Sequence, residues 1–141
     1  MQITDAAKAL KFIYGGKAIF TLVSKVTGKR YTYRTRLGGD GGPLIFADLL
    51  TGPDNSSDYI YLGHFWARGS KGLMAGAKGN PSHPAFAALD WTLLMLHGNH
   101  MPSTLEFWHE GRCARCGRRL TTPESIESGF GPECVKKGVA V

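Results

Sequence analysis

Hydrophobic and polar residues alternate most clearly between residues 17 and 37, in the segment KAIFTLVSKVTGKRYTYRTRL. β-Branched and aromatic residues recur at alternate positions on both sides of a Thr27-Gly28 pair, which predicts a β-hairpin. Successive side chains of a strand point to opposite faces. One face of the second strand would therefore carry Tyr31, Tyr33, Thr35 and Leu37, and the other Arg30, Thr32, Arg34 and Arg36. The hairpin is expected to place one face in the core and to present a basic ladder on the other.

The remaining apolar segments predict more strands and one long helix. Segments 43–50 and 58–67 are typical of strands, and a final short strand at 104–111 leads into the cysteines. Helical spacing between Ser82, a candidate cap, and Gly98 predicts the long helix.

Three other segments complete the expected secondary structure. A shorter helix is expected to begin at a Thr4 cap and to end before Gly15-Gly16. The glycine-rich segments 38–42 and 68–84 are expected to be connections, the second either functional or disordered.

Together these elements predict an α+β fold in two parts. The first, residues 1–105, would be an antiparallel β-sheet of about four or five strands with an N-terminal β-hairpin and one main packed helix. The second, residues 106–141, would be a small C-terminal zinc-binding module.

The positive charge of the chain is concentrated in its first third. The formal net charge is +6, and residues 6–39 contain eight Lys or Arg residues and no acidic residue. Such asymmetry indicates a polyanionic partner, usually nucleic acid. No run of eighteen apolar residues is present, and the first residues lack the pattern of a signal peptide. We therefore expect an intracellular, cytoplasmic protein without a membrane partner.

The three cysteines predict a metal site in the C-terminal part. In a reducing compartment clustered cysteines are typical metal ligands, and an odd number cannot pair off into disulfides. The pattern His109-x3-Cys113-x2-Cys116-x17-Cys134 offers one imidazole and three thiolates to one structural Zn²⁺. The alternative is that His109 is a core histidine and the thiols are free. Between the ligands, Thr122 is expected to cap a short helix that starts at Pro123 and ends at Gly129.

The segment GRCARCGRRLTTPESIESGFGPEC resembles a short zinc-knuckle module of bacteriophage and mobile-element proteins, a domain of unknown function called DUF6011. The shared pattern is C-x2-C-G-R-x-L-T, then P-x-S, then G-x-G-P-x-C. Two upstream segments, FTLVSKVTGKRYTYR and LLTGPDNSSDYIYLG, also resemble phage proteins. The resemblance implies a phage or prophage origin and a bacterial host cell, and it brings no catalytic residues.

The sequence argues against the enzyme classes that its motifs suggest. A zinc deaminase needs H-x-E with P-C-x-x-C and an open metal position, whereas His109 and Glu110 are adjacent here. The HGNH segment, residues 97–100, follows an apolar helix and lacks the hairpin context of a nuclease motif. No phosphate-binding loop is present, and no small-molecule substrate is evident. We expect a protein that is not an enzyme.

The first functional hypothesis is a nucleic-acid-binding accessory protein, with salt-sensitive and sequence-independent binding. Its basic residues would be Lys25, Lys29, Arg30, Arg34, Arg36, Arg68, Lys71, Lys78, Arg115 and Arg118, with Tyr59, Tyr61 or Trp66 stacking bases if these rings are not buried.

The second hypothesis is a protein-binding inhibitor of a host complex, such as an anti-phage defence complex (an anti-CRISPR-like role). It would depend on a few anchors such as Trp66 or Trp108. A virion or assembly component is a third option.

Overall fold

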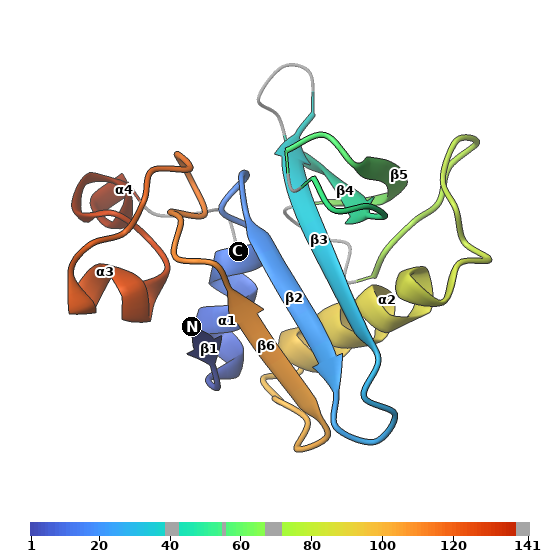
Figure 1. The fold of residues 1–141 in the computed structure, drawn as a ribbon, viewed down its shortest axis with the longest axis horizontal. Helices are drawn as coiled ribbons and strands as arrows, with labels where there is room; N and C mark the ends of the chain where they lie inside the picture. The colour runs from blue at the N-terminus through green and yellow to red at the C-terminus, as the bar shows by residue number, and fades with distance from the viewer. Residues whose placement is uncertain (39–42, 55, 67–71, 138–141) are drawn as a thin grey trace.

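The computed structural model describes residues 1–38, 43–54, 56–66 and 72–137. It shows a six-stranded antiparallel sheet in the order β1-β6-β2-β3-β4-β5 (Figure 1). The strands are β1 (Gln2–Ile3), β2 (Ile19–Ser24), β3 (Arg30–Leu37), β4 (Leu44–Leu50), β5 (Tyr59–Trp66) and β6 (Leu105–His109). The helices are α1 (Ala6–Ile13), α2 (Pro84–His97), α3 (Pro123–Ser128) and α4 (Pro132–Lys137). The predicted α+β class is confirmed.

The predicted hairpin is formed by β2 and β3. Its register runs from Ile19 opposite Arg34 to Val23 opposite Arg30. The turn contains Gly28 at a φ of +73°, a backbone conformation that glycine adopts without steric cost. Tyr33 is buried, and its hydroxyl donates a hydrogen bond to the Ala85 carbonyl oxygen of α2 at 2.8 Å. Because Tyr33 points toward α2, its neighbours in β3 must point away from it, as predicted.

The helices α1 and α2 cover the same face of the sheet. In Figure 1, α1 and α2 lie behind the strands, and the other face of the sheet is turned toward the viewer. Phe20 stacks between Tyr33 and Phe107, with ring centroids 5.3 and 5.1 Å apart, and Phe12 of α1 meets Phe107 edge-on at 6.0 Å. Such aromatic pairs each contribute about 0.5–1.5 kcal/mol beyond their buried area. The core therefore lies between the sheet and two helices. On the opposite face, which we call the open face, the described residues place no helical layer.

Three details differ from the prediction. The sheet has six strands because the two residues of β1 pair with β6. Asp5, and not Thr4, caps α1, since its carboxylate accepts a hydrogen bond from the Lys8 amide at 2.9 Å. His83, and not Ser82, caps α2, since its Nδ1 accepts from the Ala85 amide at 3.0 Å. In both cases the true cap is the next residue along the chain.

The C-terminal segment packs directly against the sheet. Its predicted boundary between residues 105 and 106 falls at the first residue of β6, which pairs with both β1 and β2. The Lys17 amide donates a hydrogen bond to the Ala114 carbonyl oxygen at 2.6 Å, and Ala114 is fully buried. We call residues 110–137, which follow β6, the module. No helix in the described part of the chain is long and apolar enough to cross a membrane.

Candidate metal centre and basic pocket

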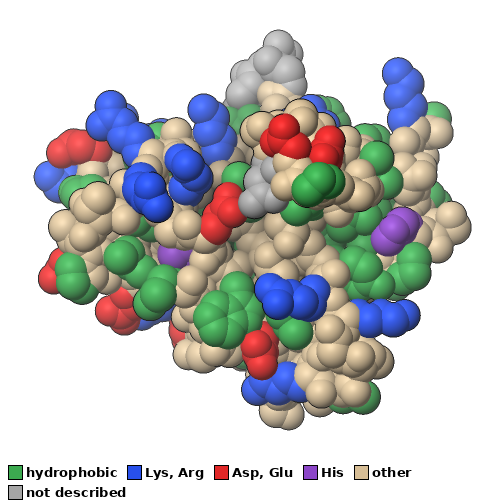
Figure 2. Space-filling view, viewed as in Figure 1, with side chains coloured by type: hydrophobic (Ala, Val, Ile, Leu, Met, Phe, Trp, Pro, Cys, Tyr) green, Lys and Arg blue, Asp and Glu red, His purple; other side chains and the backbone are tan. Residues whose placement is uncertain are grey.

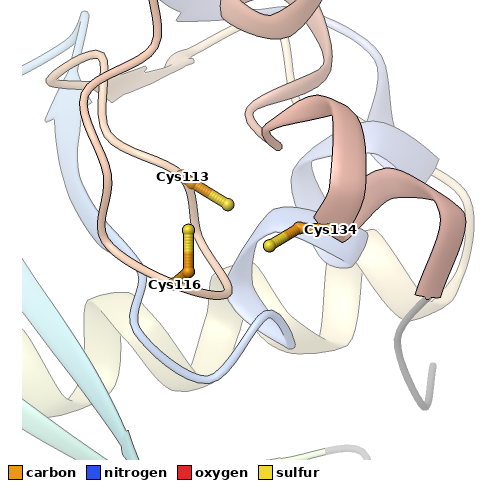
Figure 3. Close-up of side chains that lie close together, drawn as sticks. All are labelled: Cys113, Cys116 and Cys134. Carbon is orange, nitrogen blue, oxygen red and sulfur yellow. The ribbon is translucent and has the colours of Figure 1, made fainter.

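The three cysteines converge in the module. Cys113 and Cys116 lie in the loop after β6, and Cys134 lies in α4 (Figure 3). The loop turns tightly because Gly117 has a φ of +80° and its amide donates to the Cys113 carbonyl oxygen at 2.9 Å. The three sulfur atoms all lie within 4.8 Å of one another. A tetrahedral zinc site with Zn–S bonds of about 2.3 Å separates its sulfur atoms by about 3.8 Å. The cluster therefore fits a metal ion that prefers sulfur ligands.

The surroundings of Cys113 favour its thiolate, which is the metal-binding form. Burial alone would raise the pKa of Cys113, but backbone hydrogen bonds from Gly131, Cys116 and Arg115 outweigh it, and the pKa falls to about 7. The Arg115 amide donates to the Cys113 sulfur at 3.4 Å. Burial, followed by the two neighbouring thiols, raises the pKa of Cys134. One thiol is therefore ready to ionise near neutral pH, and the next must lose its proton when a cation arrives.

His109 is not where a fourth ligand was expected. It is buried on the side of β6 that also buries Phe107, as the strand alternation predicts, but it is not part of the thiol group. Its Nδ1 accepts a hydrogen bond from the Gly111 amide at 3.0 Å, and its Nε2 lies 2.8 Å from the Ile126 carbonyl oxygen. An amide only donates and a carbonyl only accepts, so Nε2 carries the proton. Burial lowers the pKa of His109, which keeps the ring neutral.

In this structure the buried imidazole lies apart from the three thiols, and its ring nitrogens contact backbone groups instead. The ring lies beside Phe12 with centroids 5.1 Å apart, and its two nitrogen atoms connect the end of β6 to α3. Strand alternation correctly predicted that His109 lies on the same side of β6 as Phe107. It could not show that backbone groups occupy both ring nitrogens.

A pocket lined by basic side chains lies between the sheet and the module. Its volume is about 550 Å³, and its lining includes Lys17, Arg34, Arg36, Arg112 and Arg115. We call this the basic pocket. Figure 2 shows Lys and Arg side chains gathered between the module and the neighbouring ends of β2 and β3. Arg34, Arg36 and Arg115 were predicted as binding residues. The docking of the module brings Lys17 and Arg112 to the same pocket.

Asp48 holds the two β3 arginines in place. Its carboxylate is buried and accepts from Arg34 at 3.0 Å and from Arg36 at 2.6 Å. The guanidinium of Arg34 also lies over the ring of Tyr59 at 4.1 Å, and that of Arg36 over Phe46 at 5.2 Å. The hydrogen bond to Asp48 raises the pKa of Arg36. Two arginines share one carboxylate, so the group keeps a net positive charge.

The other predicted basic residues do not join the basic pocket. Lys25, Lys29 and Arg30 lie at the turn end of the hairpin, and Lys29 lines a separate cavity beside Trp91. Arg118 lines the cavity next to Cys116 and Cys134. Arg68 and Lys71 lie outside the described residues.

The predicted aromatic residues lie on the open face of the sheet. Tyr61 is opposite Asp48, and its ring meets Phe46 edge-on with centroids 5.8 Å apart. A bulge between Ala47 and Asp48 changes the alternation of β5, so that His64 and Trp66 also point to this face. A shallow pocket of about 480 Å³ is lined by Phe46, Tyr61, His64, Lys78 and Arg36. We call this the aromatic pocket; Arg36 lines it as well as the basic pocket.

Comparison with known proteins gives one family match. Residues 104–137, less than half of the chain, match a family of unknown function, DUF6011. No curated protein and no solved structure matches the chain. The match covers β6 and the three cysteines, so it agrees with the resemblance seen in the sequence, and it assigns no activity.

Proposed function

We propose that this protein binds single-stranded nucleic acid across the open face of its sheet, and that a zinc-stabilised module forms one wall of the phosphate-binding pocket. The observation that carries the proposal is the basic pocket. Five cationic side chains from β3, the segment before β2 and the module line one cavity. Phosphate groups are the common anionic ligand for such a surface.

The pocket is prepared for binding before any ligand arrives. The hydrogen bonds to Asp48 and the stacking on Tyr59 and Phe46 fix the guanidinium groups of Arg34 and Arg36. Side chains that are already ordered lose less entropy when they bind, at about 0.5–1.5 kcal/mol for each flexible side chain. Arginine forks also match phosphate geometry better than lysine does.

Aromatic rings next to the pocket favour a single strand over a duplex. Arg36 lines both the basic and the aromatic pockets, so a strand held there by a phosphate reaches Tyr61 and His64 with its bases. Bases that are unpaired can stack on such rings, at about 1–3 kcal/mol each, whereas paired bases cannot reach them. Figure 2 looks onto this face, where basic, acidic and apolar side chains are interspersed.

The resemblance of the module to phage proteins supports a phage or prophage origin for this protein. We propose that the protein is a non-enzymatic accessory protein of a phage or prophage, and that it acts in the host cytoplasm. The zinc ion would be structural, because the module is too short to build a large core of its own.

Direct titration tests the proposal. Fluorescent single-stranded DNA, single-stranded RNA and duplex DNA of equal length are offered to the zinc-loaded protein at two salt concentrations. We expect the single strands to bind more tightly, and all binding to weaken as salt rises. No binding at low salt would overturn the proposal and favour a host protein as the partner.

A ring variant with a matched control tests the stacking step. Tyr61→Leu keeps an apolar side chain on the open face but removes the ring, so single-strand affinity should fall about 5- to 150-fold. Tyr31→Leu changes the same residue type on the opposite face, where the ring packs near His83, and should leave affinity unchanged. Equal losses in both variants would count against stacking on Tyr61.

A further inference from the structure

The thiol cluster borders a cavity. Cys116 is exposed, and Cys116 and Cys134 both line a cavity of about 480 Å³, whereas Cys113 is buried and is not part of its lining. Among the described residues, the metal-binding group consists of the three cysteines alone. Zinc takes four ligands in structural sites, and sites with three protein ligands keep a position for an exchangeable one.

His109 is held away from that position by its own hydrogen bonds. Coordination through Nδ1 would displace the Gly111 amide, and coordination through Nε2 would displace the Ile126 carbonyl oxygen. Either change would take a partly buried backbone group from its partner. It would also disturb the contact between His109 and Phe12.

We propose that the module holds its metal through three thiolates and leaves the fourth position open to an exchangeable small ligand, with preference for a thiol that also carries a negatively charged group. The preference follows from the cavity wall, where Arg118, Arg119 and Lys137 outnumber Glu133. A fourth thiolate also gives zinc a ligand set that it commonly takes. The volume lies within the range of small-molecule sites. This inference rests on the proposed metal site and is independent of nucleic-acid binding.

X-ray absorption spectroscopy of the zinc-loaded protein, reduced without added thiol, tests the ligand set. We expect three sulfur ligands and one oxygen or nitrogen ligand, without the outer-shell scattering of an imidazole ring. Adding mercaptopropionate should convert the site to four sulfur ligands in a saturable way. Imidazole scattering in the absence of added ligand, or failure of the added thiol to enter, would overturn the proposal. Failure to take up zinc would instead refute the metal site itself.

Variants test separately whether His109 is a ligand and whether the arginines of the cavity select the added thiol. In His109→Gln, the glutamine amide can supply both a hydrogen-bond donor and an acceptor. We expect the absorption spectrum of the Co²⁺-loaded variant to match that of the unchanged protein. A shifted spectrum in a folded variant would identify His109 as a ligand. Mercaptoethanol lacks the carboxylate of mercaptopropionate and should bind several-fold more weakly. The Arg118→Gln/Arg119→Gln variant should remove that difference, and equal affinity of both thiols in the unchanged protein would refute the anionic preference.

Discussion

Removing two cations from the basic pocket should flatten the salt dependence of oligonucleotide binding by a calculable amount. The described lining carries five cations, and Asp48 offsets one, which leaves about four positive charges. On a single strand, each neutralised phosphate contributes about −0.7 to the slope of log K against log salt. If phosphates match the pocket charge, the slope is about −3. The Lys17→Gln/Arg112→Gln variant should bring it to about −1.4.

Both substitutions should leave the fold intact. Among the described residues, the Arg112 side chain donates a hydrogen bond to the Gly117 carbonyl oxygen at 3.3 Å, on the surface, and Lys17 holds the module through its backbone amide. The assay is fluorescence anisotropy of a labelled single strand over a range of salt concentrations. Circular dichroism checks that the variant stays folded.

A control with the same change of charge makes the result specific. Lys25→Gln/Arg30→Gln removes two charges at the turn end of the hairpin, and Arg30 lies four residues from Arg34, the nearer pocket arginine on β3. At about 3.3 Å per residue that is about 13 Å, which exceeds the Debye length of about 8 Å at physiological salt. The control slope should stay close to −3. If the two double variants change the slope equally, binding follows net charge, and the pocket has no special role.

Three further predictions concern stability and the metal. In urea unfolding, Gly129→Ala should destabilise the fold more than Gly111→Ala. Both glycines have a φ near +80°, and an alanine in that conformation costs about 1–2 kcal/mol. At position 129 the new Cβ would also collide with the ring of Phe12, which adds about 1–3 kcal/mol. Equal losses of unfolding free energy in the two variants would show that the Phe12 ring moves aside without cost. Tyr33→Phe should cost about 1 kcal/mol, because the Ala85 carbonyl oxygen loses its buried donor; an unchanged midpoint would contradict this. Removing the metal with a chelator should lower oligonucleotide affinity at least tenfold, because the module supplies part of the pocket, and reloading with zinc should restore the affinity. Anisotropy that the chelator leaves unchanged would refute this coupling.

Local patterns predicted the hairpin and the module helix well. The alternation in β3 depends only on neighbouring residues, and it correctly separated the buried Tyr33 and Thr35 from the arginines. The Thr122 cap and the Gly129 exit of α3 were also predicted, because each follows from one side chain or one backbone conformation.

Features that depend on tertiary contacts could not be predicted in the same way. The strand β1 has two residues and exists because it pairs with β6, more than a hundred residues away. The bulge in β5 inserts Leu62 between two partners on β4, and this single residue brings His64 and Trp66 to the open face. Without it, strict alternation from Tyr61 would have placed Phe65 on that face, whereas Phe65 is buried.

The position of His109 explains why the module and the sheet depend on each other. Each module helix has six residues, so the module has little apolar surface to bury alone. Its buried Phe130 instead packs against Phe12 of α1, and His109 connects β6 to α3 through both ring nitrogens. If His109 were a metal ligand, the metal would compete with these links for the same nitrogen atoms. With three thiolates as the ligands, a metal ion would hold the loop that carries Arg112 and Arg115, while the histidine independently connects β6 to α3, so the two links would support the module wall of the basic pocket without competing.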